Sequence, residues 1–297
     1  MFHKIFNLVL IGALFISSCK QSVDNQSKDE IDLNDSSVQE DHLSRVKKIF
    51  YNVPSPIEMA NLTRNLGVVY TKELLNPASK VDNYNTTASL ALNLGVYGAD
   101  LSYCRISDQI QESVNNLAAT KRLTKALKIQ PEEGSFALTR LKENINNRDT
   151  LLQIIADVYS NADIYLKEND RGSTSVLIIL GGWIEALYIG TNMVDEKKPD
   201  EMLMKRIAEQ KYSIENLIQL LELYPDNKNL SEKMLPQLKN IQMAFNEIPV
   251  TQGESTVNTN KTTGVTTIGG SSEVKVNIQH IIKIKGLITT LRNEIVK

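Results

Sequence analysis

The chain has 297 residues, of which 41% are apolar, with 33 basic and 35 acidic side chains. This composition is ordinary for a globular protein with a real core. The slightly acidic balance excludes the basic footprint of a nucleic-acid-binding protein, so we expect no nucleic-acid partner.

Residues 1–18 have the pattern of a signal peptide. Lys4 supplies a positive charge, and the apolar run from Ile5 to Ile16 is shorter than the roughly 20 residues of a membrane-spanning helix. The segment Ile16-Ser17-Ser18-Cys19 then resembles the lipobox of bacterial lipoproteins. The resemblance implies cleavage before Cys19 and acylation of that cysteine with fatty acids such as palmitate. The alternative is an ordinary secretory signal with a chance cysteine near its end.

Lipidation at Cys19 would make it the attachment point to a membrane. Two or more acyl chains, at about 0.8 kcal/mol per buried methylene, give stable anchoring where one chain is marginal. Lys20 stands where an aspartate would favour inner-membrane retention in the enterobacterial sorting rule, so we expect the cell outer membrane, on either face. The signal holds only Lys4, so the mature chain would have 32 basic and 35 acidic residues, a net charge of −3.

Three regions are predicted after the signal. Residues 19–44 are polar and acidic with no apolar period, and we expect a disordered tether. Residues 45–297 are expected to form a single all-α domain, either a multi-helix bundle or stacked helical hairpins. Its first helix should begin at Ser55-Pro56-Ile57-Glu58, where a cap, a proline and a glutamate coincide, continue to Leu74 and stop at Asn76-Pro77.

Helical spacing predicts eight further helices. They cover approximately Thr87–Ser107, Ser107–Lys128, Ser135–Asn146, Asp149–Lys167, Ser173–Met193, Asp200–Leu223, Leu230–Asn246 and Asn277 to the end. The insertion 251–277 is different, since it is rich in threonine, serine and glycine. Val265–Ile268, Gly269-Gly270 and Val274–Val276 are predicted as a small hairpin, with a flexible loop as the alternative.

Two of the predicted helices resemble each other. Leu94-Gly95 and Leu180-Gly181 both precede an aromatic residue, an acid and a leucine, which suggests an internal duplication; chance similarity of two amphipathic helices is the alternative. Glycine in a helix costs roughly 1 kcal/mol relative to alanine. We therefore expect another helix to cross closely at these glycines.

The acids in these helices, Glu185 and Asp100, are the candidate polar site. Val176–Met193 is the most apolar segment of the mature chain, and Glu185 stands in its middle. As part of a buried helix, Glu185 needs a partner such as an arginine, a tyrosine hydroxyl or a backbone amide. Buried carboxylates with raised pKa values are candidates for function. The alternative is that both acids lie at the rim of a partly exposed stripe.

No stronger constellation of catalytic or metal-binding residues occurs. The mature histidines, His42 and His280, lie far apart, and Cys104 would be a lone cysteine, which is more typical of a core residue than of a reactive thiol. The chain has no HExxH, GxSxG, GxxxxGK[ST] or GxGxxG motif. We expect no catalytic residue, no metal and no cofactor.

Two family resemblances bear on function. The run from Ala91 to Tyr103, with Asn144–Asp149 and Gly181–Glu185, looks like a group of uncharacterised helical lipoproteins of Bacteroidetes, which implies a cell-envelope protein and no activity. A weaker likeness, at Ile184–Gly190, is to the imelysin family of iron-regulated envelope proteins. The histidine of that motif is missing here.

These observations favour a lipid-anchored, non-enzymatic binding or scaffold protein of the envelope, with another envelope protein as a partner. One alternative is an envelope hydrolase that uses Asp100 and Glu185 as paired carboxylates. The other is an imelysin-like, metal-related protein.

Overall fold

The computed structural model describes residues 70–129, 139–140, 143–144, 147, 150, 154, 162–252, 256–259, 266–269 and 272–297. They all belong to the second of the two units into which the chain divides, residues 40–297. The predicted signal peptide, Cys19, the tether and the helix start at Ser55 lie outside the described residues.

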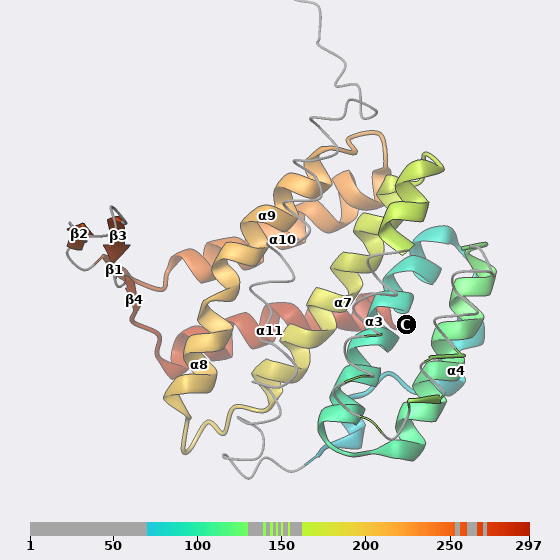
Figure 1. Ribbon diagram of the computed structural model, residues 1–297, viewed down its shortest axis with the longest axis horizontal. Helices are drawn as coiled ribbons and strands as arrows, with labels where there is room; N and C mark the ends of the chain where they lie inside the picture. Colours follow the sequence, from blue (N-terminus) through green and yellow to red (C-terminus); the bar gives the residue numbers. More distant parts are fainter. Residues whose placement is uncertain are drawn as a thin grey trace, which may run out of the picture. The chain divides into compact units, whose positions relative to one another are not determined.

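The prediction of an all-α, multi-helix bundle is confirmed (Figure 1). Residues 162–168 are also helical. The seven longer helices are α3 (Thr87–Ile106), α4 (Ile110–Ala126), α7 (Gly172–Asn192), α8 (Glu201–Ala208), α9 (Gln210–Glu222), α10 (Leu235–Asn246) and α11 (Ile278–Ile295).

Helices α3, α8 and α11 begin with side-chain caps, and none of the seven longer helices in the described residues has glycine as its C-cap. Thr86 caps α3 in a capping box with Ser89, and Asn277 caps α11 in a capping box with His280. Left-handed residues follow α3, α4 and the helix at 162–168; they are Asp108, Lys128 and Asp170, with φ between 53° and 56°. The chain turns out of each helix at these residues, a role that glycine fills more often.

Three predicted helices differ in detail from the structure. The first does not continue as an α-helix to Leu74: Tyr70 and Thr71 are irregular, and short 3₁₀ turns follow at Lys72–Leu74 (η1) and Ala78–Asn83 (η2). Asp200–Leu223 is divided at Glu209 into α8 and α9. A π-type turn, Asn229–Met234 (η3), precedes α10, where Pro236 lacks the N–H that a regular ladder needs.

Helices α3 and α7 cross at their glycines, as expected, and make the most extensive contact between any two described elements (Figure 1). A Cβ atom on Gly95 would lie 2.1 Å from the Ile178 carbonyl oxygen, and one on Gly181 would lie 2.0 Å from that of Leu92. The two contacts are reciprocal. Gly95 and Gly181 are 86 positions apart in the sequence, and so are Leu92 and Ile178.

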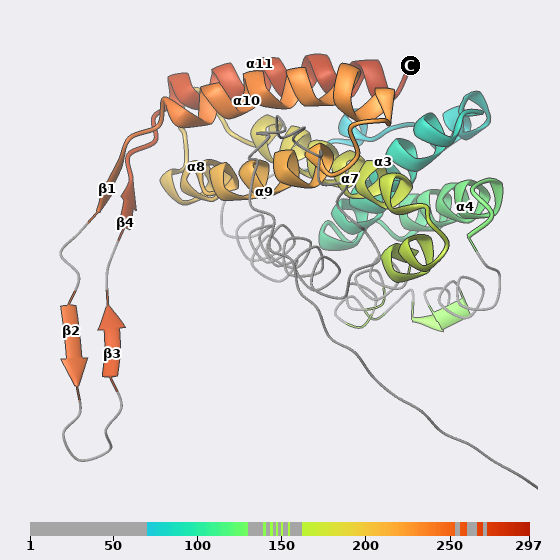
Figure 2. The ribbon, with the colours of Figure 1, turned by 90° about the horizontal axis from the view of Figure 1, so that it is seen from above.

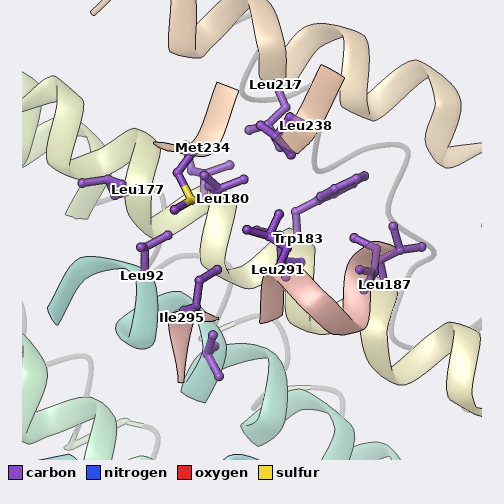
Figure 3. Packing of buried hydrophobic residues seen from close by; sticks show 14 of the residues in the cluster. Leu92, Leu177, Leu180, Trp183, Leu187, Leu217, Met234, Leu238, Leu291 and Ile295 are labelled. Carbon is purple, nitrogen blue, oxygen red and sulfur yellow. The ribbon is translucent and has the colours of Figure 1, made fainter. Parts of the chain in front are cut away.

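The apolar core lies where α7 meets the C-terminal helices. Leu180 and Trp183 of α7 gather with Leu217 of α9, Leu238 of α10 and Leu291 of α11 (Figure 3). Helices α10 and α11 lie side by side (Figure 2). The last helix is therefore an integral part of the core.

The insertion forms a hairpin, but not the predicted one, because its strands pair differently. Strand β1 (Val250–Gln252) pairs antiparallel with β4 (Ser272–Val274), and β2 (Thr256–Thr259) with β3 (Thr266–Gly269). Gly269-Gly270 is therefore not the turn of the hairpin. The prediction paired β3 with the residues after the glycines, whereas its partner lies before it in the chain (Figure 2).

Among the described helices, α7 alone is long and apolar enough to cross a membrane by length and composition. Most of it is buried inside the domain. This is the pattern of the core helix of a soluble domain as much as that of a membrane span.

Candidate functional site

Asp100, Glu185 and Arg292 meet inside the domain. We call them the acid–arginine cluster. They come from α3, α7 and α11, and neither acid exposes any surface, while Arg292 exposes 7%. The close crossing of α3 and α7 brings the two acids together, and α11 adds the arginine.

Arg292 and Glu185 form a bidentate ion pair. The Nε and Nη2 atoms of Arg292 donate to Oε2 and Oε1 of Glu185, each at 2.9 Å. Nη2 also donates to the Leu74 carbonyl oxygen at 3.1 Å, and the guanidinium lies over the Tyr188 ring, 4.7 Å from its centre. Two parallel charge-assisted hydrogen bonds are the strongest pairing available to a carboxylate, so Glu185 is ionised.

Asp100 has a different environment. The backbone N–H of Asn76 donates to its Oδ2 at 3.0 Å, and the carboxylate of Glu185 is near enough to influence its pKa. Its Oδ1 is buried and receives no hydrogen bond. Burial and the charge of Glu185 raise the pKa of Asp100 well above its usual value.

Arg292 favours the ionised form of Glu185, and burial beside that charge favours the protonated form of Asp100. Burial raises the pKa of Glu185 as well, but Arg292 opposes that rise. A protonated Asp100 carries an O–H donor, and its Oδ1 is the carboxyl oxygen of the cluster that accepts no hydrogen bond. The cluster then has no net charge, which is what makes its burial tolerable.

Asparagine and tyrosine side chains surround the cluster. The Asn76 amide donates to the Tyr84 hydroxyl at 3.0 Å and to Asn93 Oδ1 at 3.2 Å. The Asn93 amide in turn donates to the Ile295 carbonyl oxygen at 3.0 Å. These bonds tie η1, η2 and the end of α11 to α3.

The arrangement suits a structural role better than a catalytic one. Carboxylates that share a proton occur at the active sites of aspartic proteases, but there they act on water and substrate. Here both carboxyls are covered, and Arg292 neutralises the ionised one.

A second ion pair lies within the helix at 162–168, and a hydrogen bond from Ser175 ties it to α7. Asp163 accepts from Lys167 Nζ at 2.6 Å and also from the Ser175 hydroxyl. Asp163 and Ser175 are buried, and burial lowers the pKa of Lys167. Sequence analysis did not single out this pair, because an acid and a lysine four residues apart are common on exposed helices.

The other candidate residues from the sequence either have surroundings that indicate no chemical function or lie outside the described residues. Cys104 is a buried free thiol; burial raises its pKa to about 12, and the Asn116 amide donates to its Sγ at 3.5 Å. His280 caps α11. Within the described residues, no group of three or more His, Cys, Asp or Glu side chains could hold a metal ion. Cys19 and His42 lie outside those residues.

Sequence analysis found the two acids but missed the residues that complete the cluster. Arg292 was treated as an ordinary residue of the predicted C-terminal helix. Asn76 was interpreted only as the end of a helix. A weak signal for Arg292 existed, since it stands between Leu291 and Ile295 on the apolar side of its helix.

Comparisons with protein-family models, with curated proteins and with solved structures found no match.

Proposed function

We propose that this protein is a lipid-anchored protein of the cell envelope, in the outer membrane, whose helical domain binds or holds another envelope component. The observation that carries this proposal is the segment Ile16-Ser17-Ser18-Cys19 directly after a short apolar run. The resemblance of Ala91–Tyr103 to Bacteroidetes lipoproteins agrees with it.

The acid–arginine cluster supports the non-enzymatic form of the proposal. The paired carboxylates of an envelope hydrolase would have to reach substrate and water. Asp100 and Glu185 are instead enclosed and engaged with Asn76 and Arg292. The candidate hydrolytic pair thus already has a role in the fold.

Metabolic labelling with an alkyne fatty acid tests the anchor. The wild-type protein should be labelled and should fractionate with membranes, whereas Cys19→Ala should lose both properties. Cys104→Ala is the matched control, because it removes the other cysteine and should leave the label in place. If Cys19→Ala is still labelled and still membrane-bound, the anchor is not at Cys19.

Crosslinking in the native envelope tests the binding role. We expect one envelope protein to be captured reproducibly by the wild-type chain. The hydrolase alternative would replace the proposal if no partner is captured and a glycan or peptide substrate is turned over by the wild type but not by Asp100→Asn, a variant that should keep the fold.

A further inference from the structure

The outer face of α4 combines exposed apolar and basic side chains. Positions 110, 114, 118, 121 and 125 lie along one side of the helix, and every one of them is exposed. We call this set the α4 outer face; its members are Ile110, Val114, Ala118, Lys121 and Lys125. Ile110 and Val114 expose 49% and 45% of their surface and stand one helical turn apart.

The charge of this helix differs from that of the chain as a whole. Residues 110–128 contain four basic side chains and one acidic one, while the whole chain has a net charge of −2. The acid, Glu112, is paired with Lys72, and Arg122 is paired with Asp82. Lys121, Lys125 and Lys128 form no ion pair with any residue in the described parts of the chain.

We propose that the α4 outer face rests on an anionic lipid surface. Ile110 and Val114 would enter the headgroup region, and Lys121 and Lys125 would meet lipid phosphates, with Lys128 beside them. Aliphatic and basic residues on one exposed helix face are the pattern of helices that lie in a membrane interface.

This inference rests on the proposed lipid anchor in one respect. An anchored domain meets the bilayer at a high effective concentration, so a contact that is weak by itself becomes occupied. The face would then set the orientation of the domain on the membrane, while the lipid at Cys19 would set its attachment.

Acetylation of lysines in the full-length protein tests the proposal. The protein is reconstituted in phosphatidylcholine vesicles with or without phosphatidylglycerol, and the reaction of each lysine is followed by mass spectrometry. Lys121, Lys125 and Lys128 should react at least about five-fold more slowly on the anionic vesicles, and high salt should remove this protection. Lys197 and Lys198, exposed between α7 and α8, should react equally on both.

Two charge-reversal variants with the same change in net charge provide the control. In Lys121→Glu/Lys125→Glu the protection of Lys128 should be lost, whereas in Lys197→Glu/Lys198→Glu it should persist. All four positions are exposed, so neither variant should disturb the fold.

Equal acetylation on neutral and anionic vesicles would overturn the proposal. Protection that appears only when envelope proteins are added would also overturn it, because the occupant would then be a protein. The anchor is judged separately, by association with the neutral vesicles, where the α4 outer face contributes little.

Discussion

Asp100 and Glu185 are both buried acids, yet their neighbours give them different states. Glu185 has a guanidinium with two parallel hydrogen bonds, whereas Asp100 has one backbone N–H and a second carboxyl. A neutral Asp100 and an ionised Glu185 follow from that difference, and the two acids should respond differently to the loss of their carboxyl groups.

Replacing Glu185 with glutamine should destabilise the domain strongly, and replacing Asp100 with asparagine should not. Glu185→Gln leaves a buried guanidinium without its counter-charge, which typically costs about 3–5 kcal/mol. Asp100→Asn keeps an acceptor for Asn76 and a donor toward Glu185, so we expect a loss below about 1 kcal/mol. Chemical denaturation of both variants measures this, and equal losses would contradict the assignment of the proton.

The proton on Asp100 also predicts how stability depends on pH. A carboxyl with a raised pKa in the folded state contributes stability that is fully present below its unfolded pKa, near 3.8, and is lost as the pH rises through the folded pKa. The free energy of unfolding of the wild type should therefore fall relative to that of Asp100→Asn as the pH rises from 5 to 9, by at most about 1.4 kcal/mol per pH unit. A difference independent of pH would show that Asp100 is ionised.

The sequence could identify the acids but not their partners. Glu185 can be recognised from the sequence because it is a charged residue in the middle of the most apolar helix. Arg292 lies 107 residues further along the chain, and the sequence has no rule that pairs it with Glu185. Asn76 acts mainly through its backbone N–H, which every residue except proline carries.

At the scale of helices, the crossing of α3 and α7 depends on single glycines. Gly95→Ala or Gly181→Ala would place a Cβ about 2 Å from a carbonyl oxygen of the other helix, so the backbones must separate. We expect each to lose at least about 2–3 kcal/mol of stability, as for overpacked cores. Gly182→Ala is the matched control: its Cβ would lie 3.5 Å from the nearest atom, so it should be neutral or slightly stabilising in thermal unfolding. Similar losses in all three variants would contradict the crossing.

The reciprocity of this crossing bears on the suggested duplication. An ancient repeat would place equivalent residues of α3 and α7 in equivalent contacts, and the shared 86-residue offset is such an arrangement. The correspondence weakens at the acids, because Glu185 is offset from Asp100 by 85 positions. The duplication stays a hypothesis supported by the crossing.

Helix positions were predictable, but the backbone conformation just after the helices was not. The positions of α3, α7 and α11 followed from apolar spacing and cap residues. The predicted ends of α3 and α7, Ser107 and Met193, lie within one residue of the observed ends. What the sequence did not predict is the left-handed conformation of Asp108, Lys128 and Asp170, because none of them is glycine. The 3₁₀ turns η1 and η2 were not predicted either. No local sequence pattern marks them, because the course of this segment is set by its contacts with the buried acid–arginine cluster.

At the scale of the whole domain, the last helix, α11, and the first described segment, around Leu74, are bound to the same core. Asn93 and Arg292 bind backbone carbonyls at opposite ends of the described chain, those of Ile295 and Leu74. Such long-range bonds close the domain as one unit. Its attachment to the envelope is then proposed to depend on the N-terminal segment, with the α4 outer face as a second contact.

The most direct test of the central claim is the intact mass of the mature protein purified from the envelope. Our account predicts a chain that begins at Cys19 and carries a diacylglyceryl group, with a third acyl chain on the new amino terminus. Fragmentation should place all the added mass on that first residue. A mature chain that begins elsewhere, or that begins at Cys19 without lipid, would contradict the account.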